Sequence, residues 1–230
     1  METNIFAQKK SLILGGTSGI GLEISKILCD FDSSVTAIGR KLPEIEKKIN
    51  FIQFDLENFL NLKNPQEFEQ KFDLLLKPLL ENTDFFVYVV GPFVQKSLEQ
   101  TSSRDWQSLA FFNYVLPGMC LSSLLKSMKE RKFGRIVFFG GTRTENVRSY
   151  KTNAAYASSK TALSVLVKSV ASEYSEFGIT CNAILPGFTR NAPKNTKLVS
   201  EVDLAQKTIF LLENENLNGV LLNVDRGWNP

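Results

Sequence analysis

Tyr156 and Lys160 are the residues of this sequence whose types and spacing best suit proton transfer. They stand four residues apart in an alanine-rich stretch, residues 153–163, that predicts a helix with both side chains on one face. An ammonium group beside a phenol favours the phenolate, so we expect the pKa of Tyr156 to fall below its ordinary value of about 10. Such a tyrosine can exchange a proton with an alcohol or carbonyl oxygen near neutral pH. Chance also produces this spacing, so the pair needs support from the rest of the chain.

The composition limits which other groups can take part in such chemistry. The chain has 230 residues, of which 43% are hydrophobic and 22% charged, and this predicts one globular domain over residues 1–230. It contains no histidine, so proton transfer has to use Tyr, Lys, Cys, Asp or Glu. Cys29, Cys120 and Cys181 stand far apart, so neither a metal site nor a disulfide framework is expected.

The charge and the apolar runs indicate where the protein works. The net charge is only +3, and no Lys/Arg cluster alternates with aromatic residues, so a nucleic-acid partner is not expected. The first ten residues lack the apolar region of a signal peptide, and no apolar run approaches the length that spans a membrane. We therefore expect a cytoplasmic protein that does not bind membranes.

A glycine-rich segment near the N-terminus predicts a phosphate-binding loop. Residues 11–14 form an apolar strand, Gly15-Gly-Thr-Ser-Gly-Ile-Gly21 follows at once, and residues 22–28 have helical spacing. In such a turn, backbone N–H groups and the positive end of the helix face a phosphate, although an ordinary glycine turn is the alternative. The segment lacks the Gly-Lys-Ser/Thr ending of a nucleotide-hydrolysing loop. The expected cofactor-binding residues here are Gly15, Thr17, Ser18, Gly19, Ile20 and Gly21.

The next predicted strand, residues 34–38, bears on the choice of cofactor. It ends in Gly39-Arg40-Lys41, with no acidic residue to bind the adenosine ribose. An arginine at this point accommodates a 2′-phosphate, so we expect Arg40 to favour NADP(H) over NAD(H). The alternative is that Arg40 and Lys41 are two solvated surface charges.

Strands and helices alternate along the rest of the chain. Apolar strands are predicted at residues 51–54, 84–90, 134–139 and 179–184, with long helices at 65–80 and 103–132. A leucine stripe at residues 74–80 suggests core packing. This order predicts an α/β fold: a Rossmann-like, doubly wound parallel sheet with helices on both faces. Residues following the strands should meet at one edge, where such sheets bind ligands: Gly15, Gly39, Asp55, Gly91, Thr142, Pro186 and Gly187.

Taken together, these segments resemble the short-chain dehydrogenase/reductase family over nearly the whole chain. The sequence looks closest to single-domain members, including the 3-oxoacyl-carrier-protein reductases. The matching segments occur in the family's order: Gly15 to Gly21, Asp55-Leu56, Asp84 to Gly91, Asn113, Gly134-Arg-Ile-Val137, Tyr156-x-x-x-Lys160, Pro186-Gly187 and Val224-Asp225-x-Gly227. Chance is then a poor explanation of the Tyr156–Lys160 pair.

The resemblance implies a role for each matching residue. Tyr156 would give or take the proton, and Lys160 would lower its pKa and hold the nicotinamide ribose. Asn113 would hold a helix bulge and a water in the proton relay; alternatively it caps its own backbone. The implied cofactor contacts elsewhere are Asp55 and Leu56 at the adenine, Val90 and Gly91 along the backbone, and Pro186, Gly187, Phe188 and Thr189 at the carboxamide.

Three departures from the family's pattern concern the substrate side. The family's catalytic serine falls at Gly141 when counted from Gly134, and on Arg143 when counted back from Tyr156. Thr142 is our candidate for the missing hydroxyl, with Thr144 weaker. The family's Asn-Asn-Ala-Gly reads Tyr-Val-Val-Gly at residues 88–91, which removes side-chain hydrogen bonds. Only 43 residues follow Gly187, so the helical lid is missing, because residues 191–200 are too few to form it.

The expected function is an NADPH-dependent oxidoreductase that transfers a hydride between the nicotinamide and a ketone or alcohol, including 3-oxoacyl thioesters. Tyr156 would be its proton donor or acceptor. The alternative is a non-catalytic NADP(H)-binding or scaffold protein with the same fold. The resemblance also implies a homodimer or homotetramer formed through the helices around Asn113 and after Tyr156.

Overall fold

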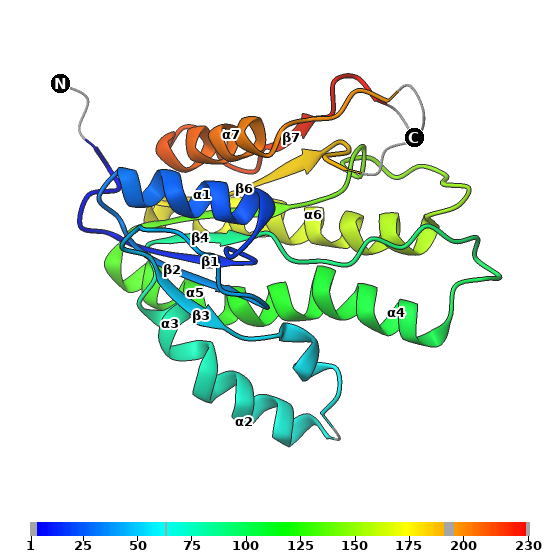
Figure 1. Cartoon of the computed structure of the whole chain (residues 1–230), viewed down its shortest axis with the longest axis horizontal. Helices are drawn as coiled ribbons and strands as arrows, with labels where there is room; N and C mark the ends of the chain where they lie inside the picture. The colour runs from blue at the N-terminus through cyan, green and yellow to red at the C-terminus, as the bar shows by residue number, and fades with distance from the viewer. Residues whose placement is uncertain (1–3, 63, 191–195, 229–230) are drawn as a thin grey trace.

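The computed structural model describes residues 4–62, 64–190 and 196–228, and its centre is a parallel sheet (Figure 1). The seven strands occur in the order β3-β2-β1-β4-β5-β6-β7, and all neighbours are parallel. They are β1 (Lys10–Leu14), β2 (Ser34–Gly39), β3 (Asn50–Gln53), β4 (Phe85–Tyr88), β5 (Gly134–Phe139), β6 (Ile179–Pro186) and β7 (Leu221–Val224). The predicted doubly wound sheet is confirmed.

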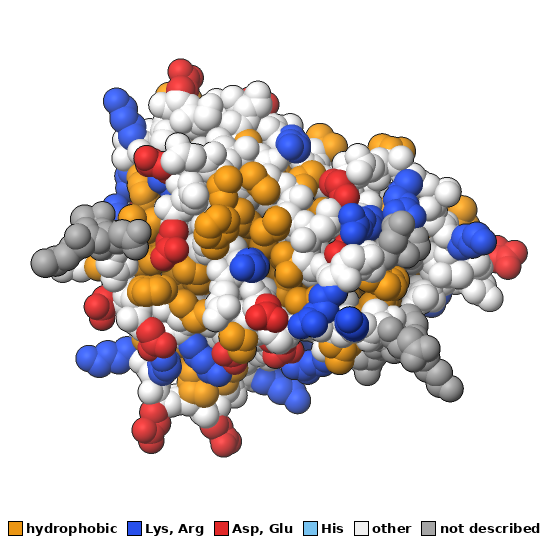
Figure 2. Space-filling model, turned by 90° about the horizontal axis from the view of Figure 1, so that it is seen from above, with side chains coloured by type: hydrophobic (Ala, Val, Ile, Leu, Met, Phe, Trp, Pro, Cys, Tyr) orange, Lys and Arg blue, Asp and Glu red, His pale blue; other side chains and the backbone are white. Residues whose placement is uncertain are grey.

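Helices cover both faces of the sheet. In Figure 1, α1 (Gly19–Asp30) and α7 (Glu201–Glu213) lie above it. The opposite face packs against the remaining helices: α2 (Pro65–Leu75), α3 (Lys77–Glu81), α4 (Ser103–Ala110), α5 (Leu116–Arg131) and α6 (Ala154–Tyr174). Three short helical segments lie between the longer elements: the 3₁₀-helices η1 (Leu56–Phe59) and η3 (Ser175–Phe177) and the π-helical η2 (Phe111–Val115). The face above the sheet also exposes hydrophobic side chains, which Figure 2 shows from above.

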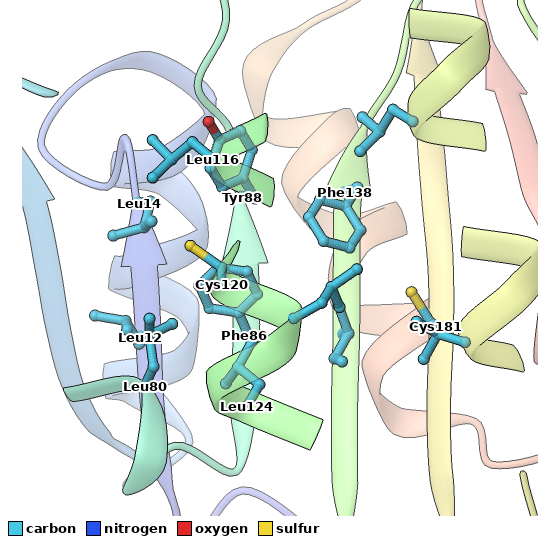
Figure 3. Packing of buried hydrophobic residues seen from close by; sticks show 14 of the residues in the cluster. Leu12, Leu14, Leu80, Phe86, Tyr88, Leu116, Cys120, Leu124, Phe138 and Cys181 are labelled. Atoms are coloured by element: carbon cyan, nitrogen blue, oxygen red, sulfur yellow. The ribbon is translucent and has the colours of Figure 1, made fainter. Parts of the chain in front are cut away.

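The central strands are apolar because both of their faces are covered. Leu12 and Leu14 of β1, Phe86 and Tyr88 of β4, and Phe138 of β5 are all fully buried. Figure 3 shows these side chains packed against Leu116, Cys120 and Leu124 of α5. Tight packing on both faces fixes the strands, and with them the loops that follow their carboxyl ends.

The helix predicted at residues 65–80 is broken in two, which corrects part of the sequence analysis. Pro78 has no N–H to donate to the Leu74 carbonyl, so the first helix ends at Leu75 and a second begins at Lys77. The break rotates the leucine stripe: Leu76 and Leu80 are buried, but Leu74 is 76% exposed. The prediction that the whole stripe packs in the core was therefore wrong.

A second correction concerns the apolar runs. The continuous helical stretch Ser103–Arg131 is long and apolar enough to cross a membrane by length and composition alone, contrary to the prediction. The core helix of a globular domain passes the same test. This stretch buries Leu109, Leu116 and Leu124 completely, and all three face the rest of the protein. Its apolar character is therefore used in packing against the sheet.

The strand order reverses between β1 and β4, which are neighbours in the sheet although two strands separate them in sequence. From β1, the chain proceeds outward through β2 and β3, then returns to continue on the other side. The loops after β1 and β4 consequently diverge and leave a crevice at the carboxyl edge.

Candidate active site

A groove of about 920 Å³ lies at this edge of the sheet. It is lined by residues at or after the carboxyl ends of β1, β2, β3, β4 and β6, which were expected to meet, and also by Phe112 and Glu201. The predicted cofactor residues that line it are Gly15, Thr17, Ser18, Gly19, Ile20, Arg40, Asp55, Leu56, Val90, Gly91 and Thr189. The predicted residues Gly21, Tyr156, Lys160, Pro186 and Gly187 lie outside the groove lining.

Two glycines of the loop after β1 are needed for close packing. Gly15 has φ of +88°, and a β-carbon there would lie 2.9 Å from the Val89 carbonyl oxygen. At Gly21 a β-carbon would lie only 2.1 Å from the Gly15 carbonyl oxygen. Gly21 therefore packs α1 against the loop and sets its position, while Gly15 lines the groove itself.

The amino end of α1 suits an anionic ligand. Ser18 caps the helix without a side-chain cap hydrogen bond, and within α1, which the structure describes in full, the first turn holds no acidic residue. Gly19 opens the helix with φ of +54°. Orphan N–H groups and the helix dipole favour phosphate here. The donors and the position of this helix end thus fit the pyrophosphate of a dinucleotide.

The far end of the groove carries the residues expected at the adenosine. Arg40 is exposed at the end of β2, and its backbone carbonyl accepts a 3.0 Å hydrogen bond from the Gln53 amide. The Asp55 carboxylate accepts a 3.0 Å hydrogen bond from the Glu57 N–H and so caps η1. Both residues line the groove, so the structure brings them to the same end of it.

Lys160 is held inside the protein near the opposite end of the groove. Its side chain is only 4% exposed, and Nζ donates a 2.7 Å hydrogen bond to the Phe139 carbonyl at the end of β5. A β-carbon at Gly91 would lie 3.1 Å from Nζ, so the amine packs directly against this glycine. Burial lowers the pKa of Lys160 to about 7.

Tyr156, one turn earlier on α6, is half-buried. Its ring meets the Phe93 ring edge-on, with centroids 4.9 Å apart. Burial raises the pKa of Tyr156 above its ordinary value, so the predicted decrease was wrong for the protein without cofactor. The physical reason is that loss of water around the phenol outweighs any stabilisation of its anion, while Lys160 donates its hydrogen bond to Phe139.

Asn113 lies in the π-helical turn η2, where the resemblance implied a bulge. The side chain is fully buried, and Nδ2 donates a 3.0 Å hydrogen bond to Oγ of Ser159. Its Oδ1 has no hydrogen-bond partner among the described residues, and a β-carbon at Gly91 would lie 2.5 Å from it. Asn113 and Lys160 thus both lie against Gly91, and a larger residue at position 91 would collide with them.

Tyr88 is a residue that the sequence analysis undervalued. It replaces an asparagine of the family pattern, but its hydroxyl donates a 2.8 Å hydrogen bond to the Phe112 carbonyl inside η2. The expected loss of side-chain hydrogen bonds at this strand is therefore incomplete, because Tyr88 ties β4 to the bulge that holds Asn113. The only available signal was a polar atom in an otherwise apolar strand.

The position beside the Tyr156 hydroxyl belongs to Gly141. A β-carbon there would lie 3.3 Å from the hydroxyl oxygen of Tyr156. Thr142 donates its hydroxyl hydrogen to the Pro186 carbonyl, and Thr144 donates to the Gly141 carbonyl at 2.7 Å. Arg143 instead pairs with Asp225 at 3.0 Å. The count from Gly134 thus identifies the neighbour of Tyr156, and each nearby threonine hydroxyl already has a backbone acceptor.

An aromatic row beside Tyr156 was not expected. Phe93, after β4, lies 6.3 Å from Phe188, after β6, and Phe188 lies 4.8 Å from Trp228, after β7 (ring centroids). Each follows the carboxyl end of a strand, which was the available signal, but nothing in the sequence showed that the three rings touch. They place an apolar surface beside the Tyr156 ring.

The loop after β6 is only partly described. Gly187 donates its N–H to the Val224 carbonyl at 3.0 Å, and a β-carbon there would lie 2.9 Å from Cα of Asp225. Gly187 thus fixes the loop against β7, and Thr189 reaches the groove. The prediction of a missing lid falls partly on residues 191–195, which lie outside the described residues; residues 196–200 lead directly into α7.

Similarity to known proteins decides which family this chain belongs to. The family model described as short chain dehydrogenase matches residues 9–203. The chain belongs to this family. It is accordingly an NAD(P)-dependent oxidoreductase acting on C=O or CH–OH groups, with a nicotinamide dinucleotide as its cofactor.

Curated relatives and solved structures agree with this assignment. "Carbonyl reductase family member 4" of Xenopus laevis is 28% identical over 240 residues, covering 95% of this chain and 97% of that protein. "3-oxoacyl-[acyl-carrier-protein] reductase FabG" of Buchnera aphidicola is 25% identical and covers 96% and 97%. A short chain dehydrogenase structure from Leptospira borgpetersenii, solved with bound NAD⁺, has a TM-score of 0.80 at 21% identity, covering 96% and 93%. This structural similarity supports the doubly wound fold of the chain.

Proposed function

We propose that this short-chain dehydrogenase is an NADPH-dependent carbonyl reductase in which Tyr156 donates the proton. The observation that carries the proposal is that the Asn113 amide and the Lys160 amine both lie against Gly91, which lines the groove. Tyr156 lies one helical turn before Lys160, on the substrate side. The relatives named as reductases at 25–28% identity support the direction.

Each residue has a distinct part in the proposed reaction. When bound, the dinucleotide supplies the hydride. Tyr156 donates its hydroxyl proton to the carbonyl oxygen, and its raised pKa keeps the phenol protonated, as a donor requires. Lys160 would hold the ribose hydroxyls of the bound dinucleotide, because its amine lies beside Gly91 of the groove. The buried Oδ1 of Asn113 lies beside Gly91 without a hydrogen-bond partner among the described residues, and it would accept a hydrogen bond from a water in the proton relay.

The preference for NADPH rests on Arg40. Its side chain is exposed at the adenosine end of the groove, directly after β2, where a 2′-phosphate would lie. A guanidinium group pairs with phosphate through charge-assisted hydrogen bonds. Lys41 lines the groove beside it and adds a second positive charge.

The proposed substrate is a ketone with an apolar tail, such as a 3-oxoacyl thioester that is reduced at its 3-oxo group. The row of Phe93, Phe188 and Trp228 offers aromatic surface next to Tyr156. Relatives include a protein named 3-oxoacyl-acyl-carrier-protein reductase and one named 3beta-hydroxysteroid dehydrogenase, from Mediterraneibacter gnavus, which is 30% identical over 195 residues. Both names describe apolar skeletons that carry a carbonyl or hydroxyl group.

A second candidate is a non-catalytic protein that binds NADP(H). It is favoured by Gly141, which offers no hydroxyl beside Tyr156, and by Thr142, whose hydroxyl hydrogen is given to Pro186. In this case the chain would retain its groove but polarise no substrate.

We further propose a cytoplasmic oligomer. All three cysteines lie in the described part of the chain and are free thiols, as a reducing compartment permits. A shallow groove between α5 and α6 is lined by Leu121, Leu125, Leu166 and Val170, and could receive a second copy. Sedimentation of the purified protein tests the oligomeric state.

The decisive experiment replaces Tyr156 by Phe. NADPH oxidation is followed with a panel of ketones and 3-oxoacyl thioesters, and NADPH binding is measured by fluorescence. The variant should lose about 10²–10⁴-fold in turnover, the size of general acid catalysis, with the Kd for NADPH unchanged. Equal turnover in both proteins rules out Tyr156 as the donor, whereas tight NADPH binding without turnover in either supports the non-catalytic candidate.

A further inference from the structure

The amino end of α1, where the cofactor's pyrophosphate belongs, is approached by a carboxylate from a distant part of the chain. A β-carbon at Gly19 would lie 3.3 Å from Oε1 of Glu201 and 4.0 Å from Nη2 of Arg190. Glu201 opens α7, and Arg190 follows β6. Both line the cofactor groove.

Glu201 and Arg190 form an ion pair over this helix end. The Glu201 side chain is 28% exposed and that of Arg190 is 69% exposed, so the carboxylate is the more enclosed member. Since α1 has no acidic residue in its own first turn, Glu201 brings a negative charge to its positive end. This arrangement matches the place and charge of a bound phosphate.

A carboxylate in this place has a consequence for binding. A pyrophosphate and the Glu201 carboxylate are both anions, and both are attracted to the same helix end. They cannot share it without repulsion, so a phosphate that enters must displace the carboxylate. Arg190 then loses its partner and is left beside the incoming phosphate, with which a guanidinium pairs well.

We propose that Glu201 is an internal anion that competes with the cofactor's pyrophosphate, and that Arg190 passes from Glu201 to the pyrophosphate on binding. The proposal rests on the assignment of this groove to a nicotinamide dinucleotide. It adds two residues to those that determine cofactor affinity: Arg190 increases the affinity, and Glu201 decreases it.

The test uses 5′-ADP, which carries the pyrophosphate but no 2′-phosphate or nicotinamide, and adenosine, which carries no phosphate. Kd values are measured by calorimetry on the whole protein at low ionic strength, where the Debye length is about 30 Å. Glu201→Gln should bind 5′-ADP about three- to tenfold more tightly, and Arg190→Gln about three- to tenfold more weakly. Adenosine should bind all three proteins equally.

Asp203→Asn is the matched control, because Asp203 lies in the same first turn of α7 but outside the groove lining. It removes the same charge from α7 and should leave the Kd for 5′-ADP unchanged. A Glu201→Gln variant that binds 5′-ADP as wild type does, or more weakly, overturns the proposal, since Glu201 would then only position Arg190. If neither 5′-ADP nor adenosine binds the wild type, the assignment of the groove to a nicotinamide dinucleotide fails. If both bind and Glu201→Gln leaves the Kd for 5′-ADP unchanged, only the role proposed for Glu201 is refuted.

Discussion

The two ends of the groove differ in how far they keep the family's pattern. At the adenosine and pyrophosphate end, the glycine loop, Arg40 and Asp55 all lie where the resemblance implied. At the substrate end, Tyr156 and Lys160 are present, but Gly141 occupies the hydroxyl position and Phe93 covers the tyrosine ring. The pyrophosphate part of the cofactor end is built from backbone geometry, whereas the substrate end depends on individual side chains.

This difference shows which changes the fold tolerates. A glycine whose missing β-carbon makes room for backbone cannot change without moving a strand or a helix. A side chain beside the substrate can change while the strands stay in place, because the loops that carry it leave the sheet. Retained cofactor binding therefore gives no evidence about catalytic power, and the two ends have to be tested separately.

The largest effect should come from Gly21→Ala at the cofactor end. The added methyl group would lie 2.1 Å from the Gly15 carbonyl oxygen, so α1 or the loop has to shift. We expect the free energy of unfolding to decrease by about 3 kcal/mol and binding of NADPH to be lost. Chemical denaturation and fluorescence titration measure both. Gly118→Ala is the control, because a β-carbon at Gly118 meets nothing within 4 Å; equal effects of the two variants would refute the role given to Gly21.

Lys160 should make stability depend on pH in the protein without cofactor. Its pKa is about 7 in the folded protein and about 10.4 in the unfolded chain. Between these values the unfolded chain binds more protons, so stability increases with pH, and below pH 7 this contribution is constant. Relative to Lys160→Met, the wild type should gain about 2 kcal/mol between pH 7 and pH 9.

Denaturation curves of both proteins at several pH values measure this difference. Subtracting the free energies of unfolding of the two proteins removes the contributions of the other titrating groups. Lys168→Met, which removes an exposed lysine from the same helix, serves as the control and should show no comparable slope. A difference between wild type and Lys160→Met that is flat from pH 7 to pH 9 contradicts the prediction.

The substrate end should respond most to Gly141→Ser. The new side chain would point at the Tyr156 hydroxyl oxygen, 3.3 Å from the added β-carbon, and could donate to a substrate carbonyl. We expect kcat/KM for reduction to increase about ten- to fiftyfold, which is less than the roughly 10²–10³-fold of an established oxyanion donor because the added side chain also crowds the Tyr156 ring. Gly141→Ala separates the hydroxyl from the added bulk, because the β-carbon is also 3.1 Å from the Tyr156 ring.

Thr142→Val decides whether the substrate carbonyl lacks a hydroxyl donor at Gly141 or receives one from Thr142, as the sequence predicted. If Thr142 leaves the Pro186 carbonyl to polarise the substrate, Thr142→Val lowers kcat/KM and Gly141→Ser brings little gain. If the Thr142 hydroxyl only holds the two loops together, Thr142→Val lowers stability by about 1 kcal/mol and leaves kcat unchanged.

The sequence predicted the fold well because its signals are local. Gly134 to Phe139 forms a strand with the predicted bounds, and the turn at Gly15 lies between the predicted strand and helix. The errors at the candidate site concern interactions between distant segments, whereas the helix break at Pro78 was a local signal that was overlooked. The hydroxyl of Thr142 is directed by Pro186, and the pKa of Tyr156 is raised by burial to which Phe93 contributes contact. No spacing rule gives the partner of a side chain across the sheet, so these features required the structure.

The smallest effect is expected at Arg40, where the cofactor end meets solvent. Arg40→Gln should weaken NADPH binding about three- to tenfold and leave NADH binding unchanged, because exposed ion pairs contribute about 1 kcal/mol or less. Fluorescence titrations with both cofactors at two salt concentrations measure this, and the loss should shrink at high salt. Lys41→Gln tests whether the effect belongs to Arg40 or to any positive charge at this end. A wild type that binds NADH as tightly as NADPH would contradict the preference, and the groove would then recognise the pyrophosphate alone.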